Sequence, residues 1–129
     1  MLKISKLSDY GFIIVAYLTV GKKVNASDIS VDTHIPLPTV NKILKKLVSH
    51  SVLNSFKGKH GGFVLNRQKD DISFLDIIEA IDGKFGITEC AISDTVCDLQ
   101  KICSIQSKIK VVNSEIKNIL TSKKISSIS

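Results

Sequence analysis

Three cysteines lie close together and are the residues best suited to hold a cofactor. Cys90, Cys97 and Cys103 fall within 14 residues, with six and then five residues between successive thiols. Thiolates at such separations can close around a soft metal ion or an iron–sulfur cluster. The spacing differs from the Cys-x-x-Cys pairs of structural zinc sites. Spacing alone also leaves open a zinc site completed by another residue, a redox pair with a spare thiol, and plain buried thiols.

A cluster or zinc ion held by three thiolates needs a further ligand. All three histidines lie outside the cysteine segment, at His34, His50 and His60. The local candidates are Glu89, Asp94, Asp98 and Gln106. Asp9 is a distant candidate, which could reach the thiols only if the first helix lay beside them in its own or a partner subunit. From the residues alone, a helix cap is the simpler role for Asp9.

A second region with chemical potential is a basic segment that has no acidic residue between Leu37 and Lys59. From Pro38 to about His50, apolar residues recur at helical spacing and basic residues lie off that stripe. The stripe consists of Val40, Ile43, Leu44 and Leu47. Such a helix can set cations against DNA phosphates and polar groups against base edges. Its candidate DNA-binding residues are Pro38, Thr39, Asn41, Lys42, Lys45 and Lys46.

The segments on either side of this helix predict a winged helix-turn-helix. A short helix over about Ala26 to Thr33, with Ile29 and Val31 as candidate buried residues, precedes a Pro-rich turn. After the basic helix, residues 52–56 and 63–65 are typical of two strands joined by a glycine-rich turn. This hairpin is the wing, and the cations at its tip are Lys57, Lys59 and His60.

Two further helices complete the predicted DNA-binding domain. The first begins with Ser8 or Asp9 as its cap, runs to about Val20 and ends at Gly21. Because it is apolar nearly all round, we expect a core helix. Its apolar run is too short to cross a bilayer and lacks a cleavage site, which favours a cytoplasmic protein. The other spans about residues 72–81, with Ser73 as cap and Asp76 completing a capping box.

The last regular pattern is a heptad seam. Gaps of three and four residues separate its apolar positions, which are Ile102, Ile105, Ile109, Val112, Ile116 and Ile119. This spacing favours pairing with the same helix of a second copy, so we expect a homodimer. The Ser- and Lys-rich residues after Leu120 are expected to fray.

Charge is distributed unevenly along the chain, which has a net charge of +6. Residues 1–69 carry 11 Lys or Arg against three acids, whereas residues 70–100 carry one Lys against eight acids. This predicts a polyanion-binding part joined to a part that does not touch the polyanion. No motif supports catalysis, since the sequence has neither a Cys-x-x-Cys pair nor a phosphate loop. We therefore expect a DNA-binding protein and not an enzyme.

The predicted fold is mostly α: a winged helix-turn-helix with a two-stranded wing and a C-terminal dimerisation helix. Residues 1–82 form the DNA-binding domain and residues 83–103 the cysteine cluster loop. Residues 104–122 form the dimerisation helix, and residues 123–129 a flexible tail. The expected partners are duplex DNA and a second copy of the chain, with no membrane.

Taken together, these residues resemble the IscR/NsrR-type winged-helix regulators that sense iron–sulfur clusters. The most specific match is the wing sequence, Gly58 to Phe63. Residues 2–11, 35–44 and 72–78 are similar to that family's first helix, turn and recognition helix, and next helix. The three cysteines match its cluster loop. The resemblance covers about residues 2–120 and is closest to the branch that regulates the SUF pathway of cluster assembly.

The resemblance implies that Cys90, Cys97 and Cys103 hold a 2Fe–2S or 4Fe–4S cluster that controls DNA binding. The first gap is one residue longer than is common in the family, and Gln106 stands where IscR-type sensors place a His. NsrR-type sensors instead use an Asp near the start of the partner's first helix, and Asp9 falls there. The resemblance therefore makes Asp9 the candidate fourth ligand.

The implied output is repression of cluster-assembly genes, with activation as the other possibility. A regulator of the same fold that senses nitric oxide, redox state or iron stays an alternative. So does an apo DNA-binding protein whose cysteines are structural.

Overall fold

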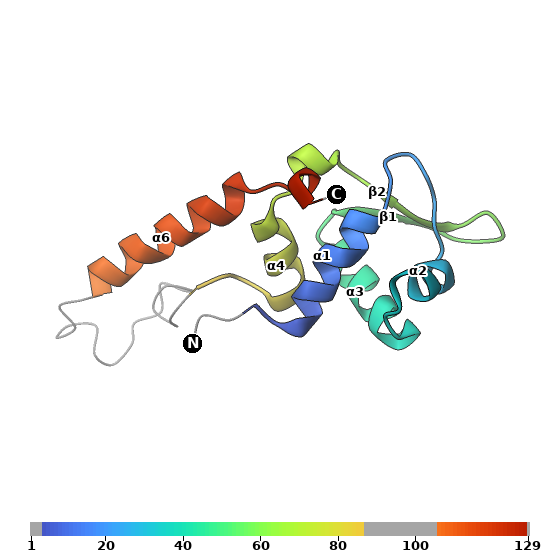
Figure 1. Cartoon of the computed structure of the whole chain (residues 1–129), viewed down its shortest axis with the longest axis horizontal. Coiled ribbons are helices and arrows are strands. Elements are labelled where there is room, and N and C mark those ends of the chain that lie inside the picture. Colours follow the sequence, from blue (N-terminus) through green and yellow to red (C-terminus); the bar gives the residue numbers. More distant parts are fainter. Residues whose placement is uncertain (1–3, 87–105, 129) are drawn as a thin grey trace.

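The computed structural model describes residues 4–86 and 106–128, and it has the predicted mostly helical fold with a two-stranded antiparallel wing. In chain order the elements are α1 (Lys6–Tyr17), α2 (Ala26–Thr33), α3 (Leu37–Ser49), β1 (Leu53–Phe56), β2 (Gly62–Leu65), the 3-10 turn η1 (Lys69–Asp71), α4 (Phe74–Asp82), α6 (Gln106–Ser122) and the 3-10 turn η2 (Ile125–Ile128). Figure 1 shows the wing and α6 at opposite ends, with α1, α3 and α4 between them.

The helix-turn-helix pair forms where the sequence predicted it. Asn25 caps α2, its side-chain oxygen accepting from the Asp28 amide at 2.8 Å. His34 then takes a left-handed conformation that ends the helix. Ile29 is fully buried, but Val31 is 70% exposed, so the prediction that both are buried was wrong for Val31. Residues two positions apart lie about 200° apart around a helix, so a short helix with one core face cannot bury both.

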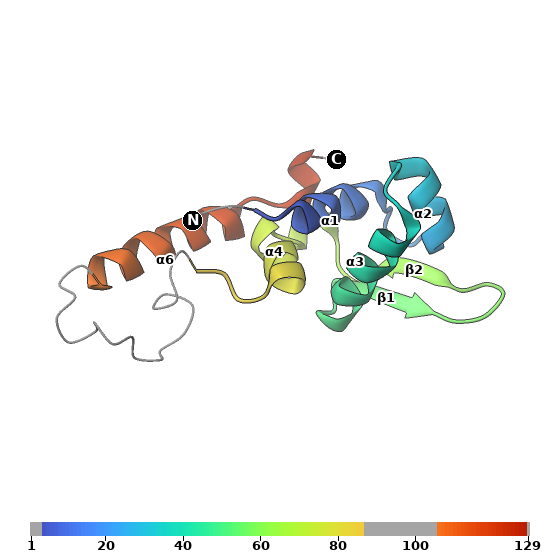
Figure 2. The same ribbon diagram turned by 90° about the horizontal axis from the view of Figure 1, so that it is seen from below.

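The apolar stripe of α3 is fully buried, as its spacing predicted. Burying this face leaves the polar face of α3 directed to solvent. The wing then pairs in the register Leu53↔Leu65 to Phe56↔Gly62. At the tip, a Cβ on Gly61 would stand 2.2 Å from the Phe56 carbonyl oxygen, so this turn accepts only glycine there. The wing lies beside α3 in both views (Figures 1 and 2).

The first helix differs from its prediction at both ends. Ser5 is the cap, its side-chain oxygen accepting from the Ser8 amide at 3.0 Å, so neither Ser8 nor Asp9 serves as the cap. The helix ends at Tyr17, and the turn at Gly21 comes four residues later. One face is buried, but Ile13 is 44% exposed, so the helix is not enclosed all round by the described residues.

The C-terminal segment packs onto the domain, in contrast to the expected flexible tail. Ile125 is fully buried in the core. Its amide donates to the Ile72 carbonyl oxygen at 2.9 Å, and the Phe74 amide donates to the Lys123 carbonyl oxygen at 3.0 Å. A single isoleucine and two backbone hydrogen bonds therefore order a segment whose Ser- and Lys-rich composition suggested fraying.

Helix α6 uses two faces. One face packs on α4, where the Lys117 ammonium lies 3.9 Å from the Glu79 carboxylate and Leu120 contacts the core. Of the described seam positions, Ile109 and Ile116 are half-buried, whereas Val112 is 45% and Ile119 58% exposed. Ile102 and Ile105 lie outside the described residues.

None of the described helices is long and apolar enough to cross a membrane.

Helix α4 begins with the predicted capping box. The Ser73 side chain accepts from the Asp76 amide at 3.0 Å, and the Asp76 carboxylate accepts from the Ser73 amide at 2.9 Å. Burial alone would raise the pKa of Asp76. The Ser73 amide and the Arg67 guanidinium, 2.9 Å away, outweigh that effect and hold this pKa below its ordinary value.

We predict that Asp76→Asn lowers the free energy of unfolding by about 1 kcal/mol at neutral pH, the usual worth of a helix cap. Because the folded-state pKa of Asp76 is lowered, its stabilisation is present above the unfolded pKa and is lost as the pH falls through the folded one. The difference in the free energy of unfolding between wild type and Asp76→Asn should therefore become smaller at about pH 3. Urea unfolding at both pH values measures it. Exposed Asp71→Asn is the control, and an equal gap for Asp76→Asn at both pH values would contradict the assignment.

Candidate nucleic-acid interface

The exposed face of α3 carries most of the predicted DNA-binding side chains. Pro38, Asn41, Lys42 and Lys45 are exposed, and Thr39 is half-buried at the start of the helix. The two ion pairs found among residues 4–86 and 106–128 join Arg67 to Asp76 and Lys117 to Glu79, so neither uses Lys42 or Lys45. These two ammonium groups are thus available to phosphates.

Lys46 is placed differently from the other predicted contacts. It is half-buried, and its ammonium group donates to the carbonyl oxygen of Ile81, at the end of α4, at 2.8 Å. A cation at the C-terminal end of a helix satisfies one of its unpaired carbonyl groups and is favoured by the helix dipole. The Lys46 ammonium group is therefore engaged at the end of α4, whereas the side chains of Lys42 and Lys45 are exposed.

The wing tip adds a second cationic surface. Lys57, Lys59 and His60 are all exposed at the turn between β1 and β2, as expected. The turn extends the hairpin away from the helices (Figure 2). A wing in this position can reach a groove or backbone next to the one that α3 enters.

A basic pair that the sequence analysis did not assign lies beside the wing. Val24 forms an antiparallel bridge with Phe63 of β2, with backbone N···O distances of 3.0 and 2.8 Å. This bridge brings the preceding Lys22 and Lys23 next to the hairpin. The Lys23 ammonium lies 4.2 Å from the centre of the Phe56 ring, in a cation–π contact. The signal in the sequence was the Lys22-Lys23 pair itself, which directly follows Gly21.

The helix-turn-helix is tied to the core through α1. The Tyr17 hydroxyl of α1 donates to the Asp32 carboxylate of α2. This hydrogen bond, helped by desolvation and by the charges of Asp32 and Asp28, raises the pKa of Tyr17. The contact fixes α2, and with it the turn into α3, against α1.

The candidate cofactor ligands fall in two parts of the chain. Cys90, Cys97 and Cys103 lie outside the described residues. Asp9 is exposed in the first turn of α1 and lines a hollow of about 550 Å³ with Ile4, Ser5, Lys6 and Phe12. Ser5 caps the helix, so the Asp9 carboxylate does not make the capping hydrogen bond. Within residues 4–86 and 106–128, no three His, Cys, Asp or Glu side chains gather to hold a metal ion.

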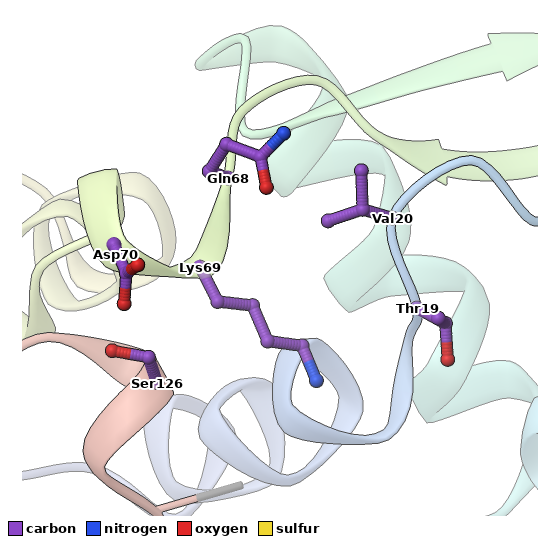
Figure 3. Close-up of a pocket in the computed structure, with 6 residues that line it drawn as sticks. All are labelled: Thr19, Val20, Gln68, Lys69, Asp70 and Ser126. Carbon is purple, nitrogen blue, oxygen red and sulfur yellow. The ribbon is translucent and has the colours of Figure 1, made fainter.

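A second hollow, of about 300 Å³, lies at the opposite end of α1. Figure 3 shows its lining residues, which are Thr19, Val20, Gln68, Lys69, Asp70 and Ser126. The Lys69 ammonium donates to the Ala16 carbonyl oxygen at 2.7 Å. Lys69 thus satisfies a carbonyl group in the last turn of α1. This hollow forms where η1 and η2 pack over the end of α1.

Comparison with known proteins places this architecture among transcription regulators. The family model described as "Rrf2: Iron-dependent Transcriptional regulator" matches residues 4–129. A relative in Lactococcus lactis, named as the HTH-type transcriptional regulator YffB, is 35% identical over 77 residues. That match spans 60% of this chain and only 49% of the relative. A relative in Aquifex aeolicus, also named as an HTH-type transcriptional regulator, is 28% identical over 84% of this chain and 78% of its own length.

Solved structures show the same fold over nearly the whole chain. CymR (YrzC), the global cysteine regulator of B. subtilis, matches with a TM-score of 0.77 at 22% identity, covering 99% of this chain and 96% of CymR. T. potens IscR matches with a TM-score of 0.65 at 21% identity, covering 98% of this chain and 85% of IscR. At these identities the likeness establishes the fold alone.

We predict that replacing Lys42 and Lys45 together by Ala weakens binding to any duplex and flattens its salt dependence. Each lost phosphate contact should lower the slope of log Kd against log salt by about 0.9. Fluorescence anisotropy of a labelled duplex at several salt concentrations measures that slope. A variant with Lys108 and Lys110, exposed on the distant α6, both replaced by Ala is the matched control. An unchanged slope for the α3 variant would remove this face from the interface.

Proposed function

Because the chain belongs to the Rrf2 family of iron-dependent transcriptional regulators, we propose that it is a homodimeric repressor of iron–sulfur cluster assembly genes whose DNA binding is controlled by an iron–sulfur cluster. The chain is a transcription regulator and not an enzyme. The observation that carries the finer proposal is the ligand set, three thiols within 14 residues together with a carboxylate that the fold leaves exposed.

The DNA-binding surface in this proposal is the solvent face of α3 together with the wing. The side chain of Asn41 can pair with an adenine edge, and Lys42 with guanine, from the start of a helix in the major groove. Lys45 and the cations of the wing tip then contact phosphates. Lys22 and Lys23 extend this second group, because the bridge between Val24 and Phe63 holds them beside the hairpin.

The donor set suits an iron–sulfur cluster. Cys90, Cys97 and Cys103 supply thiolates, the ligands such clusters prefer. Asp9 supplies the fourth ligand, from the partner subunit, and the structure supports this role in one respect. Its carboxylate is exposed, is not used as a helix cap, and accepts no hydrogen bond found among the described residues. When bound, the cluster gives the protein a group that responds to iron supply and oxidation.

The dimer is proposed to form through residues 104–122, of which residues 106–122 are α6. The inner face of this helix is already occupied by α4, whereas the seam positions Val112 and Ile119 stay about half exposed in the single chain. Apolar positions in strict three–four spacing are buried when a second copy packs against them. A two-fold dimer also presents two α3 helices to a palindromic DNA site.

We predict that protein purified without oxygen is coloured and contains iron and acid-labile sulfide. Its visible spectrum should change when Cys97→Ser removes one thiolate. Asp9→Ala should leave the cluster bound but more quickly lost in air, because one ligand is missing. Asp70→Ala, an exposed acid elsewhere, is the control for Asp9. A colourless, iron-free protein that still binds DNA would overturn the cluster proposal, and equal cluster lifetimes for Asp9→Ala and wild type would reject Asp9 as a ligand.

We predict that replacing Val112 and Ile119 together by Glu converts the dimer to a monomer, because two charges would be forced into the seam. Light scattering at micromolar concentration measures the mass. Val31→Glu is the control, since Val31 is an exposed apolar side chain outside α6. A wild-type protein with the mass of one chain would contradict the dimer.

A further inference from the structure

The last turn of α4 is a junction at which several parts of the protein meet. The Asp82 carboxylate accepts from the hydroxyls of Ser5 and Ser8, in the first turn of α1, at 2.7 to 2.8 Å. The Glu79 carboxylate accepts from the Phe85 amide at 2.9 Å and pairs with Lys117 of α6. This turn is thereby held by α1, by α6 and by the chain that leads toward the cysteine segment.

The DNA-reading helix is attached to this same turn through Lys46. The Lys46 ammonium donates to the Ile81 carbonyl oxygen at 2.8 Å, and the Ile81 side chain is buried against α1 at Gly11. Lys46 lies one residue after Lys45 and one helical turn after Lys42, so it shares a face of α3 with Lys42. The side chains of Lys42 and Lys45 are exposed, whereas Lys46 is half-buried. Of these three lysines, Lys46 is the one whose ammonium group makes a hydrogen bond within the domain.

We propose that Lys46 is a positioning residue: it sets the orientation of α3 in the DNA groove through the last turn of α4, without contacting a phosphate. The inference rests on the proposed placement of α3 on DNA and assigns Lys46 a different role from its neighbours. An ammonium group that donates to the Ile81 carbonyl oxygen is held at the end of α4 and not extended toward the DNA backbone. It can, however, limit how far α3 shifts or rotates relative to α1 and α4.

The two roles leave different signatures in binding data. Loss of a phosphate contact weakens binding to every duplex alike and lowers the salt slope. Loss of a positioning contact leaves the charge facing the DNA unchanged, so the slope and the non-specific affinity stay the same. Base readout depends on aligned hydrogen bonds, so only the affinity for the preferred sequence falls.

The experiment compares Lys46→Met, which keeps the apolar stem without the donor, with Lys45→Met. The probes are a duplex selected by wild-type protein from a random-sequence pool and a scrambled duplex of the same composition. For Lys46→Met, we expect Kd for the selected duplex to rise about tenfold, the usual effect of losing a charged hydrogen bond. Kd for the scrambled duplex should stay within about twofold, at an unchanged slope. For Lys45→Met both Kd values should rise and the slope should fall by about 0.9.

Two further measurements secure the interpretation. Lys46→Arg keeps a cationic donor and should restore most of the discrimination between the two duplexes. Stoichiometric titration gives the active fraction of each variant, so partial unfolding is not mistaken for weaker binding. A salt slope that falls for Lys46→Met as it does for Lys45→Met would overturn the positioning role alone. Unchanged binding for both variants would overturn it together with the proposed placement of α3.

Discussion

The arrangement of this domain depends on the close approach of α1 and α4 at Gly11. A Cβ at this position would stand 2.3 Å from the Cδ1 atom of Ile81 and 3.2 Å from the Cγ2 atom of Ile77, so these buried side chains would have to shift to admit it. With no side chain there, the last turn of α4 can pack directly on α1. The same approach brings Asp82 to the serine hydroxyls at the start of α1 and presents the Ile81 carbonyl oxygen to Lys46. One missing side chain thus allows three helices to meet at a single turn.

Much of the fold could be predicted because local patterns and tertiary packing agree. The four-residue stripe of α3 is buried as its spacing requires, and α2 has the predicted bounds. The wing forms between its predicted strands because Gly61 and its neighbours allow a turn that other residues cannot make. In each case the residues that form the sequence pattern are the same residues that make the contacts in the folded domain.

The errors arose where a single residue or a long-range contact decided the outcome. Val31 was grouped with Ile29 without regard to the angle between their positions on the helix. Ile125 orders the C-terminal segment, yet composition gave more weight to the serines and lysines around it. The partner of Lys46 lies 35 residues away, so no local pattern could separate Lys46 from Lys45. The bridge that places Lys22 and Lys23 beside the wing is also a long-range contact.

The acidic stretch beside the basic domain acquires a structural explanation from these contacts. Asp76 is held by Arg67 and the Ser73 amide, Glu79 by Lys117 and the Phe85 amide, and Asp82 by two serine hydroxyls. Acids engaged in this way are directed into contacts within the domain and away from the exposed face of α3, where unpaired carboxylates would repel phosphates. The segregation of charge along the chain therefore does two things at once. It leaves the exposed face of α3 cationic, and the anionic side chains of α4 connect this helix to α1 and α6.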